Sequence, residues 1–114
     1  MSDGGLRPLE FWASSLDDLR EFPDAVRQDA GYQLHLVQAG KEPSDWKPMK
    51  SIGSGVREIR VWDATGAFRI IYVVKFGDAV IVLHCFEKRG QKTSGPDLEL
   101  AKKRYQEVAR EYGK

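Results

Sequence analysis

The sequence predicts an α+β domain in the order β-α-α-β-β-β-α, in which helices pack on an antiparallel sheet. Residues 56–63, 68–76 and 79–86 are rich in β-branched and aromatic side chains. Short turns with Gly and Asp separate them, as in an antiparallel meander. Helical periodicity marks residues 24–38 and 97–112 on either side of these segments. We therefore expect one domain, 1–114, which is an ordinary length for a single core.

A short strand and a short helix are expected at the start of the chain. In residues 8–12, Leu9 and Phe11 alternate with polar or bulky neighbours, which is typical of a strand with two different faces. Residues 16–22 follow with acidic side chains in the first turn of a helix, and Pro23 ends that helix.

The second helix is predicted over residues 24–38 and the region after it as a loop. Apolar side chains follow a spacing that places them on one buried stripe: Val26, Ala30, Leu34 and Val37. Gly40 is a suitable C-terminal stop. Residues 41–55 hold several Pro, Gly and Ser residues, so we expect a loop that leads to the sheet.

The last of the three strands is predicted to lie inside the sheet. Residues 79–86 are apolar on both faces until His84, which is typical of a strand covered on both sides. Cys85 is its neighbour, and adjacent strand residues point to opposite faces, so the two side chains cannot pair directly. By simple alternation, His84 shares a face with Val80, Val82 and Phe86.

Composition narrows the functional classes. No apolar run approaches the roughly 20 residues of a membrane span, and the N-terminus lacks a secretory signal. A single cysteine makes the reducing cytosol the default, so we expect a cytoplasmic protein with no membrane partner. His35, His84 and Cys85 cannot form a zinc cluster, and we expect no metal and no cofactor.

Charge is distributed unevenly along the chain. Residues 1–45 hold 4 basic and 9 acidic side chains, a balance of −5. Residues 46–114 hold 14 basic and 8 acidic, a balance of +6. A positive half can attract phosphates, although charges on helix faces can equally serve only solvation.

Cations on and beside the predicted sheet are the main candidates for chemistry. They are Arg57, Arg60, Arg69, Lys88, Arg89 and Lys92. Hairpin geometry allows several of them to converge at one end of the sheet. Arg69 has apolar neighbours, so its guanidinium must be either paired or functional. A salt bridge to Glu58 or Glu87 is the structural alternative.

Motifs in these segments resemble a known toxin superfamily. They are VREIR at 56–60, FRIIYV at 68–73, LHCFEKRGQKT at 83–93 and AKKR at 101–104. In this order the motifs resemble the RelE/ParE superfamily, and within it the HigB-like, phage-derived branch. The similarity extends over about residues 9–110, nearly the whole chain.

The resemblance implies a RelE-like fold and the toxin of a type II toxin-antitoxin system. Such toxins are endoribonucleases that cleave mRNA on the ribosome without metal. The ribose 2′-hydroxyl attacks the adjacent phosphate and leaves a 2′,3′-cyclic phosphate. Their antitoxin partner usually carries a helix-turn-helix domain. A non-catalytic relative that binds RNA, the ribosome or a protein is the alternative, as is a ParE-like gyrase inhibitor.

Residue roles follow from the same resemblance. It implies phosphate stabilisation by Arg69, a leaving-group position for Arg89 and a phosphate contact for Arg60. Contacts to RNA or the ribosome are expected from Arg57, Lys88 and Lys92.

The general base is left open by the sequence. Histidine suits this role near neutral pH, so His84 is a candidate catalyst if it faces RNA and a core residue if it faces a helix. Gly95 stands where some relatives have a tyrosine. Trp46 and Trp62 are expected either to pack or to stack on bases.

Overall fold

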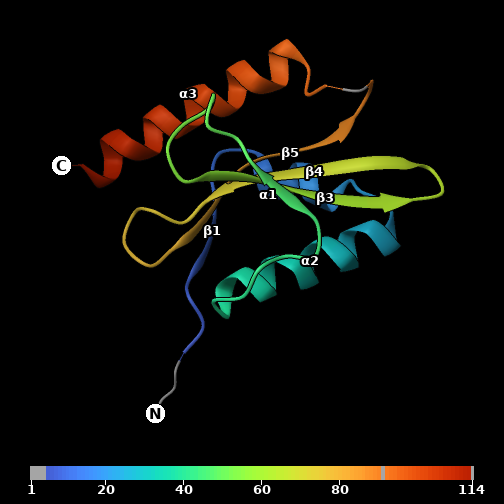
Figure 1. Cartoon of the computed structure of the whole chain (residues 1–114), viewed down its shortest axis with the longest axis horizontal. Helices are drawn as coiled ribbons and strands as arrows, with labels where there is room; N and C mark the ends of the chain where they lie inside the picture. The colour runs from blue at the N-terminus through green and yellow to red at the C-terminus, as the bar shows by residue number, and fades with distance from the viewer. Residues whose placement is uncertain (1–4, 91, 114) are drawn as a thin grey trace.

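The computed structural model describes residues 5–90 and 92–113, which form a five-stranded sheet and three helices (Figure 1). The strands are β1 (Leu9–Phe11), β2 (Trp46–Pro48), β3 (Val56–Asp63), β4 (Gly66–Val73) and β5 (Val80–Lys88). The helices are α1 (Ser15–Arg20), α2 (Asp24–Gln38) and α3 (Gly95–Tyr112). No helix in these described segments is long and apolar enough to cross a membrane.

The strand order confirms the predicted α+β class. The strands lie in the order β1-β5-β4-β3-β2, and β3, β4 and β5 form the expected antiparallel meander. The strand β1 pairs in parallel with β5, so β5 is an interior strand, as its apolar sequence predicted. The turn between β3 and β4 is closed by Asp63, whose Oδ1 accepts hydrogen bonds from the backbone N–H groups of Thr65 (2.7 Å) and Gly66 (3.1 Å).

The strand β2 was not expected, because residues 41–55 were predicted as a loop. It pairs antiparallel with β3 at the edge of the sheet, with Lys47 opposite Glu58 and Pro48 opposite Arg57. Proline is tolerated on an edge strand because its missing N–H faces away from the ladder. The prediction failed because the strand is short and contains a proline. The strand β2 thereby brings Lys47 onto the sheet beside Glu58.

Helices cover both faces of the sheet (Figure 1). The helices α1 and α2 pack on one side, here called the α2 face, and α3 packs on the other, the α3 face. The predicted stripe of α2 is buried against that sheet face at Val26, Ala30, Leu34 and Val37. On the other side Ala101 and Val108 of α3 meet Ile71 and Ile81. Burial of each large apolar side chain contributes about 1.5–3 kcal/mol.

A β-bulge in β5 changes which side chains share a face. Ile71 pairs with His84 and Tyr72 pairs with Val82, so Leu83 is an extra residue in β5. As a result Val82 lies in the core of the α2 face, while Leu83 lies in that of the α3 face. His84 lies on the α3 face with Phe86, as predicted, but the prediction that it also shares this face with Val80 and Val82 is wrong. Regular alternation cannot reveal a bulge.

Candidate functional site

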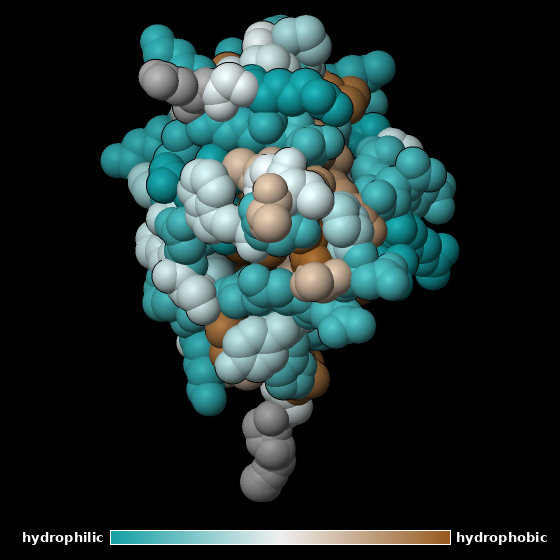
Figure 2. All heavy atoms as spheres, turned by 90° about the vertical axis from the view of Figure 1, so that its right-hand side faces the viewer, coloured by the Kyte–Doolittle hydropathy of each residue, from teal (hydrophilic) through white to brown (hydrophobic). Residues whose placement is uncertain are grey.

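The α3 face is only partly covered by its helix. In Figure 1 the β3–β4 hairpin extends beyond the first turn of α3. Figure 2 views the molecule from this end and shows a mainly hydrophilic surface. The sheet register places polar side chains of the α3 face in adjacent rows: Lys47 beside Glu58, Arg60 beside Arg69, and Trp62 in line with Ala67 and Lys88. We call Lys47, Arg60, Arg69 and Lys88 the cation cluster.

Arg69 is held by a buried ion pair beneath this surface. Its Nε lies 3.3 Å from Glu58 Oε1, and the side chains are 2% and 0% exposed. Glu58 also accepts a hydrogen bond from Thr93 Oγ1 (2.9 Å), and Lys47 Nζ lies 4.0 Å from its Oε1. A buried charge that loses its partner is strongly destabilising. The salt bridge that the sequence left open for Arg69 is therefore present, with Glu58 as its partner.

Arg60 is the more accessible arginine of this row. Its side chain is 31% exposed, and its Nη1 lies 3.8 Å from Asp45 Oδ1. The other oxygen of Asp45 accepts a hydrogen bond from Trp62 Nε1 (3.2 Å). The Trp62 ring in turn lies against Arg69, with 5.0 Å between the guanidinium carbon and the ring centroid. Arg69 is thus enclosed between Glu58 and Trp62, whereas Arg60 reaches solvent.

Burial and the neighbouring cations affect the pKa of Lys88. Partial burial lowers the pKa of this lysine, and the charges of Arg69, Lys47 and Arg60 lower it further, against the opposing effect of Glu58. Burial likewise lowers the pKa of Arg69, although a guanidinium stays charged at any physiological pH. The four cations of the cluster lie beside the carboxylates of Glu58 and Asp45, and this excess of positive charge favours a bound anion.

Arg57 lies on the other side of the sheet. Its guanidinium carbon is 4.0 Å from the Trp46 ring centroid, and its Nη1 lies 3.3 Å from a Glu42 carboxylate oxygen. It lines a cavity of about 300 Å³ together with Tyr72, whose pKa burial raises. The strand alternation that separates Arg57 from Arg60 keeps this predicted RNA-binding residue away from the cation cluster.

Arg89 and Lys92 lie beyond the end of β5. Arg89 has an 84% exposed side chain, and its Nη2 lies 3.3 Å from Glu87 Oε1. Glu87 precedes Lys88 on the strand and points to the opposite face. Lys92 is exposed in the segment that leads to α3. The structure thus brings Lys88 to the cluster, while the roles predicted for Arg89 and Lys92 stay predictions.

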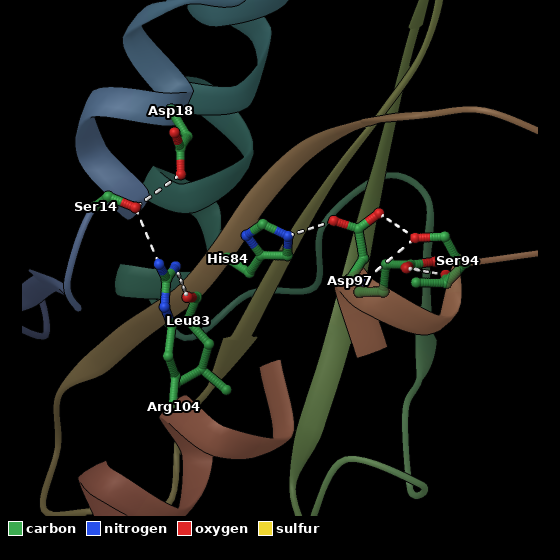
Figure 3. A network of polar contacts seen from close by, with 9 residues as sticks. Ser14, Asp18, Leu83, His84, Ser94, Asp97 and Arg104 are labelled. Carbon is green, nitrogen blue, oxygen red and sulfur yellow. Dashed lines mark hydrogen bonds and ion pairs between the residues drawn. The ribbon is translucent and has the colours of Figure 1, made fainter. Parts of the chain in front are cut away.

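His84 is buried and binds α3 (Figure 3). Its Nε2 lies 2.6 Å from Asp97 Oδ1, and its ring stacks on Phe86 with centroids 4.8 Å apart. In the described part of the chain its buried Nδ1 has no hydrogen-bond partner. Asp97 also accepts a hydrogen bond from Ser94 Oγ (2.6 Å), the N-cap residue of α3. This geometry anchors the first turn of α3 to β5.

A second contact of α3 passes through Arg104. Its Nη1 donates to the carbonyl oxygen of Leu83 (2.9 Å) and its Nη2 donates to Ser14 Oγ (2.9 Å), as Figure 3 shows. The carbonyl of the bulge residue is thereby satisfied. The helix is fixed at two points along β5, so the edge of the open surface has a defined position.

Comparison with known proteins identifies the family. The family model described as "Phage derived protein Gp49-like (DUF891)" matches residues 17–106. This chain belongs to the Gp49-like family of phage-derived proteins. A comparison with curated proteins gave no significant match.

A solved structure gives the same fold for this Gp49-like protein. It is the E. coli toxin RelE, as a double arginine-to-alanine mutant in the free state. The TM-score is 0.66 at 18% identity, over 87% of this chain and 97% of that chain. The structural match confirms the predicted RelE-like fold, and the family model confirms the predicted relationship to phage-derived proteins.

Sequence reasoning missed Lys47 and Asp45 as members of the Gp49-like protein's site. Both flank Trp46, and the pattern Asp-Trp-Lys-Pro gave a weak signal of a short edge strand. Among the described residues, no group of three or more His, Cys, Asp and Glu side chains is placed to hold a metal ion.

Proposed function

We propose that this Gp49-like protein is the toxin of a type II toxin-antitoxin system that cleaves mRNA on the ribosome. The observation that supports the proposal is the cation cluster on the open end of a RelE-like sheet, where Arg60 and Lys88 lie beside the buried charge of Arg69. Its substrate implies a cytoplasmic location. Its regulator would be a co-expressed antitoxin, expected to carry a helix-turn-helix domain.

The chemistry requires a 2′-hydroxyl and positive charge. The 2′-hydroxyl gives up its proton as its oxygen bonds to phosphorus, and the bond from phosphorus to the 5′ oxygen breaks. The leaving 5′ oxygen takes up a proton, so the products are a 2′,3′-cyclic phosphate and a 5′-hydroxyl. Negative charge grows on the non-bridging oxygens, and each preorganised donor aimed at them contributes about 3 kcal/mol. Arg60 is placed to supply such a donor. Arg69 would act without touching the phosphate, because it is buried and held by Glu58. The positive charge of Arg69 would raise the electrostatic potential at the surface.

Lys88 is the side chain of the cluster best suited to move the proton. A neutral lysine can accept the proton of the 2′-hydroxyl, whereas a guanidinium stays charged, and burial and the neighbouring cations lower the pKa of Lys88. We assign His84 a positioning role instead, because its side chain is 7% exposed and Nε2 already contacts Asp97. Arg89 and Lys92 would contact RNA or the ribosome next to the cluster.

Induction of the protein in cells, followed by mapping of 5′ ends on mRNA, tests the proposal. Cuts that require translation and keep a fixed phase relative to codons are expected. Growth arrest with DNA damage and intact mRNA would instead indicate a ParE-like gyrase inhibitor. Intact mRNA without DNA damage would indicate a non-catalytic binding protein.

A further inference from the structure

Trp62 is an exposed aromatic side chain within the open surface. It is 60% exposed and lies near the end of β3, where it pairs with Ala67 of β4 beside the β3–β4 turn. Trp12 and Trp46, in contrast, are half-buried. An indole this exposed contributes little to the core, so its position needs another explanation.

Its orientation is fixed by two polar contacts. Trp62 Nε1 donates a hydrogen bond to Asp45 Oδ2 (3.2 Å), and the Arg69 guanidinium carbon lies 5.0 Å from the ring centroid. Asp45 also pairs with Arg60 at 3.8 Å, so the ring is linked to a residue of the cation cluster. A ring held in this way loses little conformational freedom when a planar ligand stacks on it.

The surroundings favour a nucleic-acid base. The next residue across the sheet is Ala67, whose small side chain leaves space, and beyond it lies Lys88. A base on the indole would therefore have its phosphate near Lys88 or Arg60. Stacking on an aromatic ring beside a positive groove is the usual way to bind single-stranded nucleic acid.

We propose that Trp62 is a stacking platform for an RNA base adjacent to the phosphate held by Arg60 and Lys88. It is a positioning residue, and Asp45 sets the angle of its ring. This inference rests on the proposed function, because it takes RNA as the ligand of the cluster. A hydrophobic contact of a protein partner is the competing explanation of the exposed ring.

Tryptophan fluorescence with a single-stranded 2′-O-methyl RNA oligonucleotide, at low ionic strength, tests the proposal. The methyl group blocks attack by the 2′ oxygen, so binding is measured apart from cleavage. Stacking on Trp62 should quench the emission of the wild type and of the matched control Trp46→Phe, whose ring lies on the α2 face. The quenching should be absent in Trp62→Phe.

Affinity for the same oligonucleotide gives a second readout. Trp62→Leu should weaken binding by about 10- to 100-fold, and Trp62→Tyr should recover most of it, because leucine is apolar but offers no ring to stack on. In the cleavage assay Trp62→Leu should raise KM more than it lowers kcat. Circular dichroism checks that each variant is folded.

Several outcomes separate the two proposals. Quenching that persists in Trp62→Phe, or its absence in the wild type, overturns the stacking platform. Unchanged RNA affinity in Trp62→Leu with weaker binding of the antitoxin also overturns it and assigns the ring to a protein interface. Trp62-dependent quenching in a protein that leaves mRNA uncut supports stacking and contradicts the nuclease.

Discussion

Glu58 and Arg69 form a buried ion pair on neighbouring strands, with Oε1 and Nε 3.3 Å apart. Arg60 of β3 pairs with Arg69 of β4, and its side chain reaches the surface next to the buried ion pair. The buried charges and the surface charges are therefore parts of one arrangement. We expect Arg69 to contribute to the candidate site through the electrostatic potential of its charge and through its contact with the Trp62 ring.

Removal of one partner of this pair should destabilise the protein. Arg69→Met leaves the buried Glu58 with Thr93 and a distant Lys47, so we expect a loss of about 3–5 kcal/mol in the free energy of unfolding. Glu58→Gln should recover part of this loss when it is combined with Arg69→Met. Chemical denaturation of the four proteins of the cycle measures both effects. Additive single effects would show that the pair is not coupled.

Lys88 should be more important for cleavage than Arg89. Lys88→Arg keeps the charge but removes a group that can accept a proton, so cleavage should slow by about 100-fold or more while RNA binding is retained. Arg89→Gln is the matched charge-loss control at the next residue; it should weaken binding of RNA or the ribosome, but at saturating protein concentration its cleavage rate should stay close to that of the wild type. Rates on ribosome-bound mRNA measure the difference. Slow cleavage by Arg89→Gln together with fast cleavage by Lys88→Arg would contradict this prediction and support the leaving-group position that the resemblance implied for Arg89.

The pH dependence of cleavage should report Lys88. A base acts in its neutral form, so the rate should rise with pH and level off below the ordinary lysine value of 10.5, because the pKa is lowered. Arg60→Gln removes one of the repelling charges, which raises the pKa of Lys88 and shifts the rise to higher pH. Single-turnover rates over the neutral to mildly alkaline range test this. A wild-type rate that does not rise with pH over this range would contradict Lys88 as the base.

His84 should matter for stability and not for the chemical step. His84→Gln breaks the contact with Asp97 and should lower the free energy of unfolding by about 1.5–3 kcal/mol. Asp97→Ala should have a similar effect, because it removes the other partner of the same contact. Thermal unfolding and cleavage rates at a temperature where both variants are folded separate the two roles. Complete loss of cleavage in folded His84→Gln would make His84 a catalyst.

The fold could be predicted from sequence wherever a regular pattern was long enough. The apolar stripe of α2 and the apolar sequence of β5 predicted the positions of these two elements closely. The short β2 and the bulge at Leu83 could not be seen, since both interrupt the regular pattern that predictions use.

The candidate site was predicted only in outline. Arg60, Arg69 and Lys88 lie on one face of the sheet. This could be predicted, because side chains alternate regularly along each strand and paired residues share a face. The side chain of Arg57 lies on the opposite face for the same reason, whereas Arg89 follows the end of β5, where alternation makes no prediction. The partner of Arg69 could be narrowed to two glutamates, but the choice of Glu58 depends on the register between β3 and β4. The contribution of Lys47 depends on a strand that was not predicted.

Cleavage of a ribosome-bound mRNA with a single 2′-deoxynucleotide at the mapped cut site tests the central claim most directly. The cluster as described supplies charge and a base but no nucleophile, so the 2′-hydroxyl of the substrate is essential. We predict that the wild type cuts the all-RNA message to a 2′,3′-cyclic phosphate and leaves the 2′-deoxy message intact. The double variant Arg60→Gln with Lys88→Gln should cut neither. A cut at the 2′-deoxy position, or undiminished cutting by the double variant, would contradict the account.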